Sequence, residues 1–308
     1  MNPVLSIAQT ALELGLISSL TVLALFLSYS MLGVCDLSTD GCFALGAAVG
    51  AVVAISGHPY LSIIAAMAAG VLSGFVVAFL QTKMGINSLL AGIIVNTGLY
   101  SVIIGIMGGA SLLNMNKTET IFTIMRALLD KTPLAPYYKT VVAAIFVALV
   151  IAFLAFFLRT RLGLAIRATG DNPDMVRSSS INPAFTTIVG LCISNSFTAL
   201  SGALLAQSQK SVTADIGSGM VTIALASLLI GGIFAFRGKV TRRALGAVLG
   251  AIIFRLVYAV ALRFNMPAFM LKLVSSVIVV IAISAPYLRQ RLPDFRRRLM
   301  HKRGGEDA

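Results

Sequence analysis

Long apolar segments separated by short polar connections dominate the chain. We assign membrane spans at about 12–34, 41–56, 60–81, 87–108, 138–158, 185–207, 219–236, 243–263 and 268–287. A helix needs about 20 mostly apolar residues to cross a hydrocarbon core, and most of these segments meet that length. Lipid offers the backbone no hydrogen-bond partners, and no segment alternates as a barrel strand does. The pattern therefore predicts an all-α, polytopic helical membrane protein with about eight to ten transmembrane helices.

The segment 41–56 differs from the others because it is short and rich in glycine. We expect it to be tilted, broken or re-entrant rather than a simple crossing. The overall composition agrees with a membrane protein, since 58% of the 308 residues are hydrophobic and only 11% are charged. A mean hydropathy of +0.94 excludes an ordinary soluble domain.

Most of the 24 Lys and Arg residues lie in one set of connections and in the C-terminal tail. Basic connections stay on the cytoplasmic side, so the N-terminus is predicted to lie outside. We divide the chain into a transmembrane domain, 1–287, which contains a cytoplasmic loop at 159–184, and a basic cytoplasmic tail, 288–308. The net charge of +13 is explained by this topology and by membrane lipid. A nucleic-acid partner is not expected, because the basic residues belong to no folded domain.

Catalytic chemistry is not indicated by the sequence. The two histidines and three cysteines are scattered, so no metal site and no cofactor are predicted. A near match to a phosphate-binding loop occurs at 232–239, but the spacing from Gly232 to Gly238 is one residue too long. Val240 also stands where Ser or Thr is required. We therefore predict a chain that is not an enzyme.

The cytoplasmic loop 159–184 contains strong helix-start signals. Asp171 or Asn172 can cap a helix, Pro173 suits its first position, and Asp174 favours the positive end of the helix dipole. These signals predict a helix of about two turns at 173–180.

Two interpretations of this helix remain open. Met175 and Val176 can fill a groove on another protein, next to the charged Arg177, which would make the helix a docking element. An ordinary cytoplasmic loop is the alternative.

A resemblance favours docking. The segment Gly163-Leu-Ala-Ile-Arg-Ala-Thr-Gly170-Asp-Asn-Pro173, followed by Ile181-Asn182, resembles the permease subunits of the ABC importer family that includes branched-chain amino acid and ribose permeases. Gly41-Cys-Phe-Ala-Leu-Gly46-Ala47 extends the match toward the N-terminus. The stretch Asp36-Leu-Ser-Thr-Asp40-Gly41 is most similar to the branch of tryptophan and tyrosine importers. The family usually has Gly where this chain has Ser180, which bears on the geometry of that turn.

The resemblance implies a function and a set of partners. The chain would be the permease subunit of an importer in the bacterial cytoplasmic (inner) membrane, passing a small solute such as an aromatic or branched-chain amino acid. Gly170, Asp171, Asn172, Pro173, Asp174, Met175 and Arg177 would couple it to ATP-binding subunits. A second permease copy and an extracytoplasmic solute-binding protein would complete the complex. An ion-gradient-driven secondary transporter is the alternative, and it would show inverted repeats and interrupted helices.

Polar residues inside the spans are candidates for the translocation pathway. They are Asn96, Thr97, Ser194, Asn195 and Arg255. Hydrogen bonding between helices would satisfy the first four equally well. Arg255 could attract a solute carboxylate, or it could pair with Asp215.

Two acids near the N-terminus and the paired glycines leave further alternatives. Asp36 and Asp40 either line a cavity or occupy a cytoplasmic turn, and the cost of charge in lipid favours the turn. Glycines four residues apart, as in Gly70 and Gly74, let helix backbones approach within the chain or across a dimer.

Overall fold

The computed structural model describes residues 3–130, 135–235 and 240–263, with isolated positions between 273 and 284. Helices account for almost all of this part. Two three-residue strands pair antiparallel, with Leu113 opposite Val212. The elements in chain order are α1 (Pro3–Leu25), η1 (Phe26–Met31), α2 (Thr39–Ile55), α3 (Pro59–Thr82), α4 (Ser88–Ile106), β1 (Leu112–Asn114), α5 (Ile121–Leu129), η2 (Ala135–Tyr137), α6 (Tyr138–Phe157), α7 (Arg161–Asp171), α8 (Pro173–Ser178), α9 (Pro183–Gln209), β2 (Ser211–Thr213), α10 (Met220–Ala235) and α11 (Val240–Arg263).

The all-α, polytopic prediction is confirmed. Six helices are long and apolar enough to cross a membrane, and α2 and α10 are shorter apolar helices. These eight correspond to the first eight predicted spans. The ninth span, at 268–287, and the basic tail, 288–308, lie almost wholly outside the described residues. The chain is a multi-pass membrane protein.

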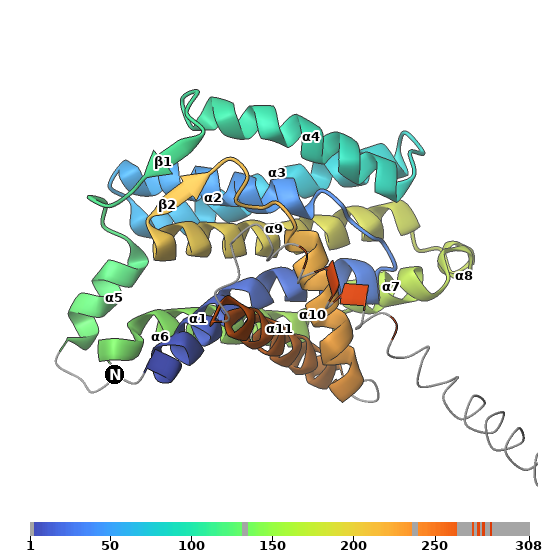
Figure 1. The fold of residues 1–308 in the computed structure, drawn as a ribbon. Coiled ribbons are helices and arrows are strands. Elements are labelled where there is room, and N and C mark those ends of the chain that lie inside the picture. Colours follow the sequence, from blue (N-terminus) through green and yellow to red (C-terminus); the bar gives the residue numbers. More distant parts are fainter. Residues whose placement is uncertain are drawn as a thin grey trace, which may run out of the picture.

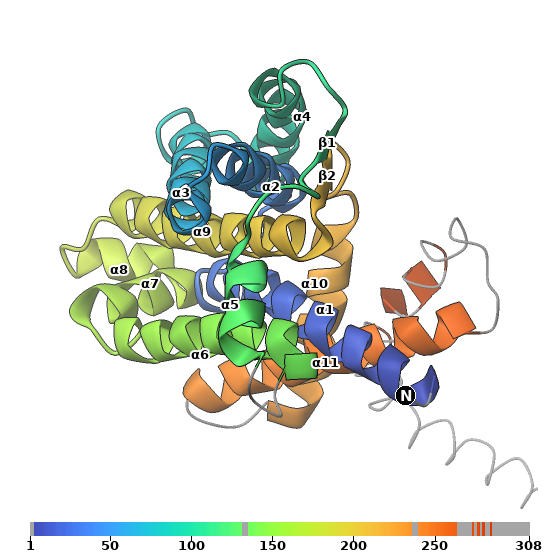
Figure 2. The ribbon, with the colours of Figure 1, turned by 90° about the vertical axis from the view of Figure 1, so that its left-hand side faces the viewer.

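Helix α9 forms the centre of the bundle. Figure 2 shows it between a layer that contains α2 and α3 and a layer that contains α1 and α6. Small residues make this position possible, because a side chain on Gly70 or Gly74 of α3 would strike the backbone of α9. Gly46 and Gly50 of α2 are packed against α9 in the same way. These glycine pairs therefore serve packing within the chain.

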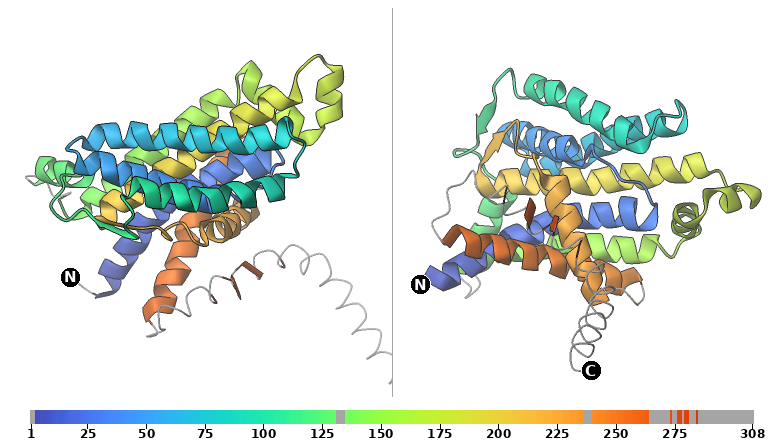
Figure 3. Two further views of the ribbon diagram at one scale, coloured as in Figure 1. Left: turned by 90° about the horizontal axis from the view of Figure 1, so that it is seen from above. Right: turned by 45° about the vertical axis from the view of Figure 1, so that its right-hand side comes forward.

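Helices α2 and α10 both begin in the interior of the bundle. Segment 32–38 returns from the end of η1 to the middle of the protein before α2 starts, and the loop 214–219 leads inward to α10 (Figures 1 and 3). The second span is short as the sequence indicated, but α2 is unbroken over its 17 residues, and its tilt or re-entry stays a prediction. The predicted span at 219–236 corresponds to α10, an apolar helix of 16 residues that is shorter than the six longest ones.

The connections gather at two ends of the bundle. The 83–87 turn, α7 and α8 lie at one end, whereas β1, β2 and α5 lie at the other (Figure 1). Lys83, Arg161 and Arg177 belong to the first end, which is the end predicted to be cytoplasmic. We refer to α7 and α8 together, residues 161–178, as the docking region, after the role that the resemblance implies for this part of the chain.

Candidate functional site

Helix α8 is the predicted short helix, and its start is fixed by a side chain. The Oδ1 atom of Asn172 accepts hydrogen bonds from the backbone N–H groups of Asp174 and Met175, each at 3.1 Å. Of the two predicted caps Asn172 is therefore the one used, since Asp171 is the last residue of α7. The helix ends at Ser178 rather than at 180 because Ser180 adopts a left-handed conformation with φ of 60°. Glycine adopts that conformation most readily, which agrees with the residue usual in the family.

The side chains of α8 divide between the surface and the interior. Met175 is 54% exposed, whereas Val176 is only 1% exposed. Val176 therefore anchors the helix to the protein, and the prediction that it could fill a groove on a partner is wrong. Arg177 and Asp174 lie 3.9 Å apart at the exposed surface and form a weak pair. Met175 is therefore the exposed apolar side chain of α8.

Helix α7 was not predicted, and it seats the docking region on the bundle. Ile166 is fully buried in a cluster with Leu32 and Leu191. The hydroxyls of Thr169 and Thr186 lie 2.8 Å apart, which joins α7 to α9. The end of α7 is also held closely, because Gly170 rests directly on the backbone that follows η1.

The contact at Gly170 leaves no room for a larger residue. A Cβ atom there would overlap the carbonyl oxygen of Met31 and would lie 3.0 Å from the Cα of Leu32. Gly33, which has φ of 72°, faces the carbonyl oxygen of Gly170 in return. The docking region therefore touches the start of segment 32–38 directly.

Asp36 is 1% exposed, so it does not occupy a solvated turn. It is also absent from the lining of the cavity beside Asp40 that is described below. Its Oδ1 accepts hydrogen bonds from the Ser38 N–H at 2.8 Å and the Ser38 hydroxyl at 2.6 Å. Its Oδ2 accepts one from Nδ2 of Asn195 in α9, at 2.7 Å. Asp36 thus ties segment 32–38 to the central helix.

Asp40 joins the two helices that begin inside the bundle. It lies in the first turn of α2, and its carboxylate accepts hydrogen bonds from the N–H groups of Gly219 and Val221 at 2.9 and 2.8 Å. Those groups belong to the start of α10, where an acid is favoured by the helix dipole and by the unpaired donors. The prediction that Asp40 occupies a cytoplasmic turn is wrong.

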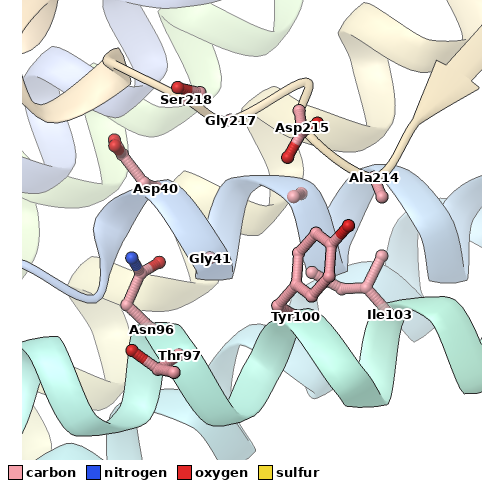
Figure 4. Close-up of a pocket in the computed structure, with 11 residues that line it drawn as sticks. Asp40, Gly41, Asn96, Thr97, Tyr100, Ile103, Ala214, Asp215, Gly217 and Ser218 are labelled. Carbon is pink, nitrogen blue, oxygen red and sulfur yellow. The ribbon is translucent and has the colours of Figure 1, made fainter. Parts of the chain in front are cut away.

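A cavity of about 280 Å³ opens beside this junction, between α2, α4 and the loop 214–219. Figure 4 shows Tyr100 rising from α4 toward the loop that carries Asp215. Within the described part of the chain, no hydrogen bond engages the Asp215 carboxylate. None of the described residues that line it is Lys, Arg or His. The lining residues are Asp40, Gly41, Ala44, Asn96, Thr97, Tyr100, Ile103, Ala214, Asp215, Gly217 and Ser218.

Two of the five pathway candidates lie at this cavity, namely Asn96 and Thr97. The hydroxyl of Ser194 instead donates to the carbonyl of Ala24 at 2.8 Å, so this residue joins α9 to α1. Asn195 binds Asp36 as described. The part of all these residues in transport stays a prediction.

Arg255 lies apart from the cavity, between α11 and α1. Its Nε atom is 3.4 Å from the Ser18 hydroxyl, and its guanidinium carbon lies 5.9 Å from the centre of the Tyr258 ring. The suggested ion pair with Asp215 is not formed. Instead, Asp215 lines the cavity together with Tyr100.

The sequence analysis did not identify Tyr100 as a residue that lines the cavity. One signal could have found it, because Tyr100 follows Asn96 by four residues and therefore shares its helix face. The position of Asp215 at the cavity had no such local signal.

The described residues contain no group of three or more His, Cys, Asp or Glu side chains that could hold a metal ion. The chemistry that this site can offer is hydrogen bonding and charge. Together, the bundle of apolar helices and an open cavity whose largely apolar lining carries a few polar groups are consistent with a membrane transport protein.

The family follows from comparison with known proteins. Residues 7–283 match the model of the family described as branched-chain amino acid transport system / permease component. The chain belongs to this family and is the permease component of an ABC-type transporter.

Named relatives support this membership. The chain is 29% identical over 289 residues to the tyrosine transport system permease protein of Clostridioides difficile, with 94% of each chain covered. It is 32% identical to an uncharacterised protein of Rickettsia prowazekii, covering 74% of this chain and 77% of that one. It is also 29% identical to the guanosine ABC transporter permease protein NupQ of Bacillus subtilis, over 56% of each chain. No solved structure matches.

The family membership decides between the two transporter classes that the sequence left open. Interrupted helices were expected of an ion-driven secondary transporter, whereas α2 and α10 are short but continuous helices.

Proposed function

We propose that this chain is the permease subunit of an importer in the bacterial cytoplasmic membrane that carries an amino acid inward. Two copies would assemble with two ATP-binding subunits, and an extracytoplasmic solute-binding protein would deliver the solute. The observation that carries the proposal is the contact between the docking region and segment 32–38, which leads to the cavity that Asp40, Tyr100 and Asp215 line. The permease itself would supply no ATPase site, and hydrolysis in the partner would drive it between outward-open and inward-open states.

The docking region supports the position of the ATP-binding subunit. Helix α8 projects from the basic end of the bundle (Figure 1), where the positive-inside rule places the cytoplasm. Its Asn172 cap and the buried Val176 hold it in place, while Met175 remains free to enter a groove. A rigid exposed helix with one apolar anchor is suited to docking.

The cavity supports a solute that carries an ammonium group. Asp40 uses both carboxylate oxygens on the start of α10, so Asp215 is the acid that remains available. A free carboxylate beside the ring of Tyr100 can bind an ammonium group by charge and by cation–π attraction. The polar amide of Asn96 and the hydroxyl of Thr97 can bind other polar atoms of the solute. This chemistry favours an amino acid, as in the tyrosine transport relative, over a neutral nucleoside.

Docking is tested by co-purification of the tagged permease with its untagged ATP-binding subunit. Met175→Glu should abolish recovery of the ATPase, because it places a charge in an apolar contact. Met84 is also strongly exposed at the same end of the bundle, so Met84→Glu is the matched control. Equal recovery with the two variants would show that α8 is not the docking element.

Solute recognition is tested by direct binding of L-tyrosine, L-leucine and guanosine to the permease–ATPase complex in nanodiscs without the solute-binding protein. Asp215→Asn should weaken amino-acid binding about tenfold, because it removes a charge-assisted contact. Glu119→Gln removes an exposed acid elsewhere at the end of the bundle that carries β1, β2 and α5. It should leave the affinity for amino acids unchanged. Tighter binding of guanosine than of either amino acid would overturn the proposed solute class.

A further inference from the structure

Asp36 is a buried acid that belongs neither to the docking region nor to the lining of the cavity. Among the residues that the structure describes, it is the only acidic side chain in the buried set. A buried carboxylate must be well hydrogen-bonded, and even then it contributes little net stability compared with an apolar side chain. Three donors surround Asp36, two from Ser38 and one from Asn195. Their arrangement suggests a role beyond stability.

The position of Asp36 along the chain points to that role. Segment 32–38 begins where the docking region touches it, because Gly170 rests on the backbone of Met31 and Leu32. It ends at the first turn of α2, where Asp40 holds the start of α10. Asp36 lies midway between these two points. The segment therefore connects the docking region to the wall of the cavity by continuous backbone.

The partner of Asp36 strengthens this connection. Asn195 belongs to α9, which begins at Pro183 directly after the docking region. Thr186 in the first turn of α9 also contacts Thr169 of α7. Segment 32–38 is therefore joined to the docking region twice, directly at Gly170 and through α9 at Asn195. A displacement of the docking region reaches the segment by both routes.

We propose that Asp36 is a positioning residue for transport, and that its hydrogen bond to Asn195 makes segment 32–38 move together with α9. Movement of the docking region then shifts the first turn of α2 and, through Asp40, the start of α10. Helix α2 and the loop 214–219 that leads into α10 line the cavity, so the movement changes its access. This inference rests on the proposed function, because it assumes that an ATP-binding subunit drives the docking region.

The test measures ATP hydrolysis and L-tyrosine uptake by the complete complex in proteoliposomes. Asn195→Ala should leave hydrolysis intact but lower uptake per ATP about tenfold, since the connection to Asp36 is lost. Exchanging the pair, Asp36→Asn with Asn195→Asp, restores a hydrogen bond between the two residues and should recover at least half of the uptake.

The matched control is Gln207→Ala on the same helix. Gln207 is fully buried and makes comparable hydrogen bonds, to the Ile121 N–H at 3.0 Å and the Ser62 hydroxyl at 2.6 Å. It lies toward the opposite end of α9 from the docking region. This control should keep the normal ratio of uptake to hydrolysis. Equal ratios in Asn195→Ala and Gln207→Ala would show that Asp36 and Asn195 serve stability alone.

A second measurement covers the case in which a variant fails to assemble. In the wild-type complex, ATP binding should change amide hydrogen exchange in residues 32–38, and no change there would overturn the inference. The outcomes also separate the two proposals. A wild-type complex that shows no ATP-driven uptake of any amino acid contradicts the proposed function. A wild-type complex that transports, with Asn195→Ala coupling normally, contradicts only the role of Asp36.

Discussion

Gly170 is the position where a single methyl group should separate ATP hydrolysis from transport. In Gly170→Ala the added carbon would overlap the Met31 carbonyl oxygen and lie 2.9 Å from the carbonyl carbon of Leu32. Both obstacles are backbone, so no side-chain rotation relieves them, and α7 must move away from η1. Overpacking of this kind costs about 1–3 kcal/mol, which corresponds to about a 5- to 150-fold shift between two states. We expect uptake per ATP to fall within that range while hydrolysis continues.

The assay is parallel measurement of ATP hydrolysis and solute uptake by the reconstituted complex, with assembly checked by co-purification. Gly105→Ala is the control, since a Cβ at that helical glycine meets nothing within 4 Å in this chain. It should leave the ratio of uptake to hydrolysis unchanged. Should Gly170→Ala assemble normally and transport with the wild-type ratio, the contact between α7 and η1 plays no part in coupling.

Three further predictions concern stability and topology. Asp40→Asn should destabilise the permease by about 1–3 kcal/mol, because one N–H group at the start of α10 loses its acceptor. The melting temperature in detergent should fall, and an unchanged melting temperature would contradict this prediction. Ser180→Val should lower the stability of the permease by about 1–2 kcal/mol and speed amide hydrogen exchange in α8, because φ of residue 180 is 60°. Ser180→Gly should do neither. Equal exchange in the two variants would refute the role of this left-handed conformation. With the three native cysteines replaced, Ser178→Cys should be labelled only from the cytoplasm and Asn116→Cys only from outside, and the reverse pattern would overturn the topology.

The sequence alone determined the class of the protein and the position of the short helix α8. Apolar segments of membrane-spanning length can satisfy their backbone only as helices, so hydropathy was sufficient to locate eight of the spans. The cap at Asn172 and the start at Pro173 are local as well, because a capping side chain bonds to N–H groups two or three residues away. The polar positions Asn96 and Thr97 were also visible, since a polar residue inside a lipid-crossing helix is exceptional.

Only the tertiary structure decided what the buried acids do. Besides Ser38, which is local, Asp36 binds Asn195, and Asp40 binds the start of α10; both of these partners lie more than 150 residues away along the chain. No periodicity or spacing encodes such a pairing, because it depends on how closely α2, α9 and α10 pack. The same holds for Val176, which is hidden by the body of the protein although its helix is short and polar. Burial is a property of the packed bundle, so a solvated turn and a buried junction could not be told apart from the residues alone.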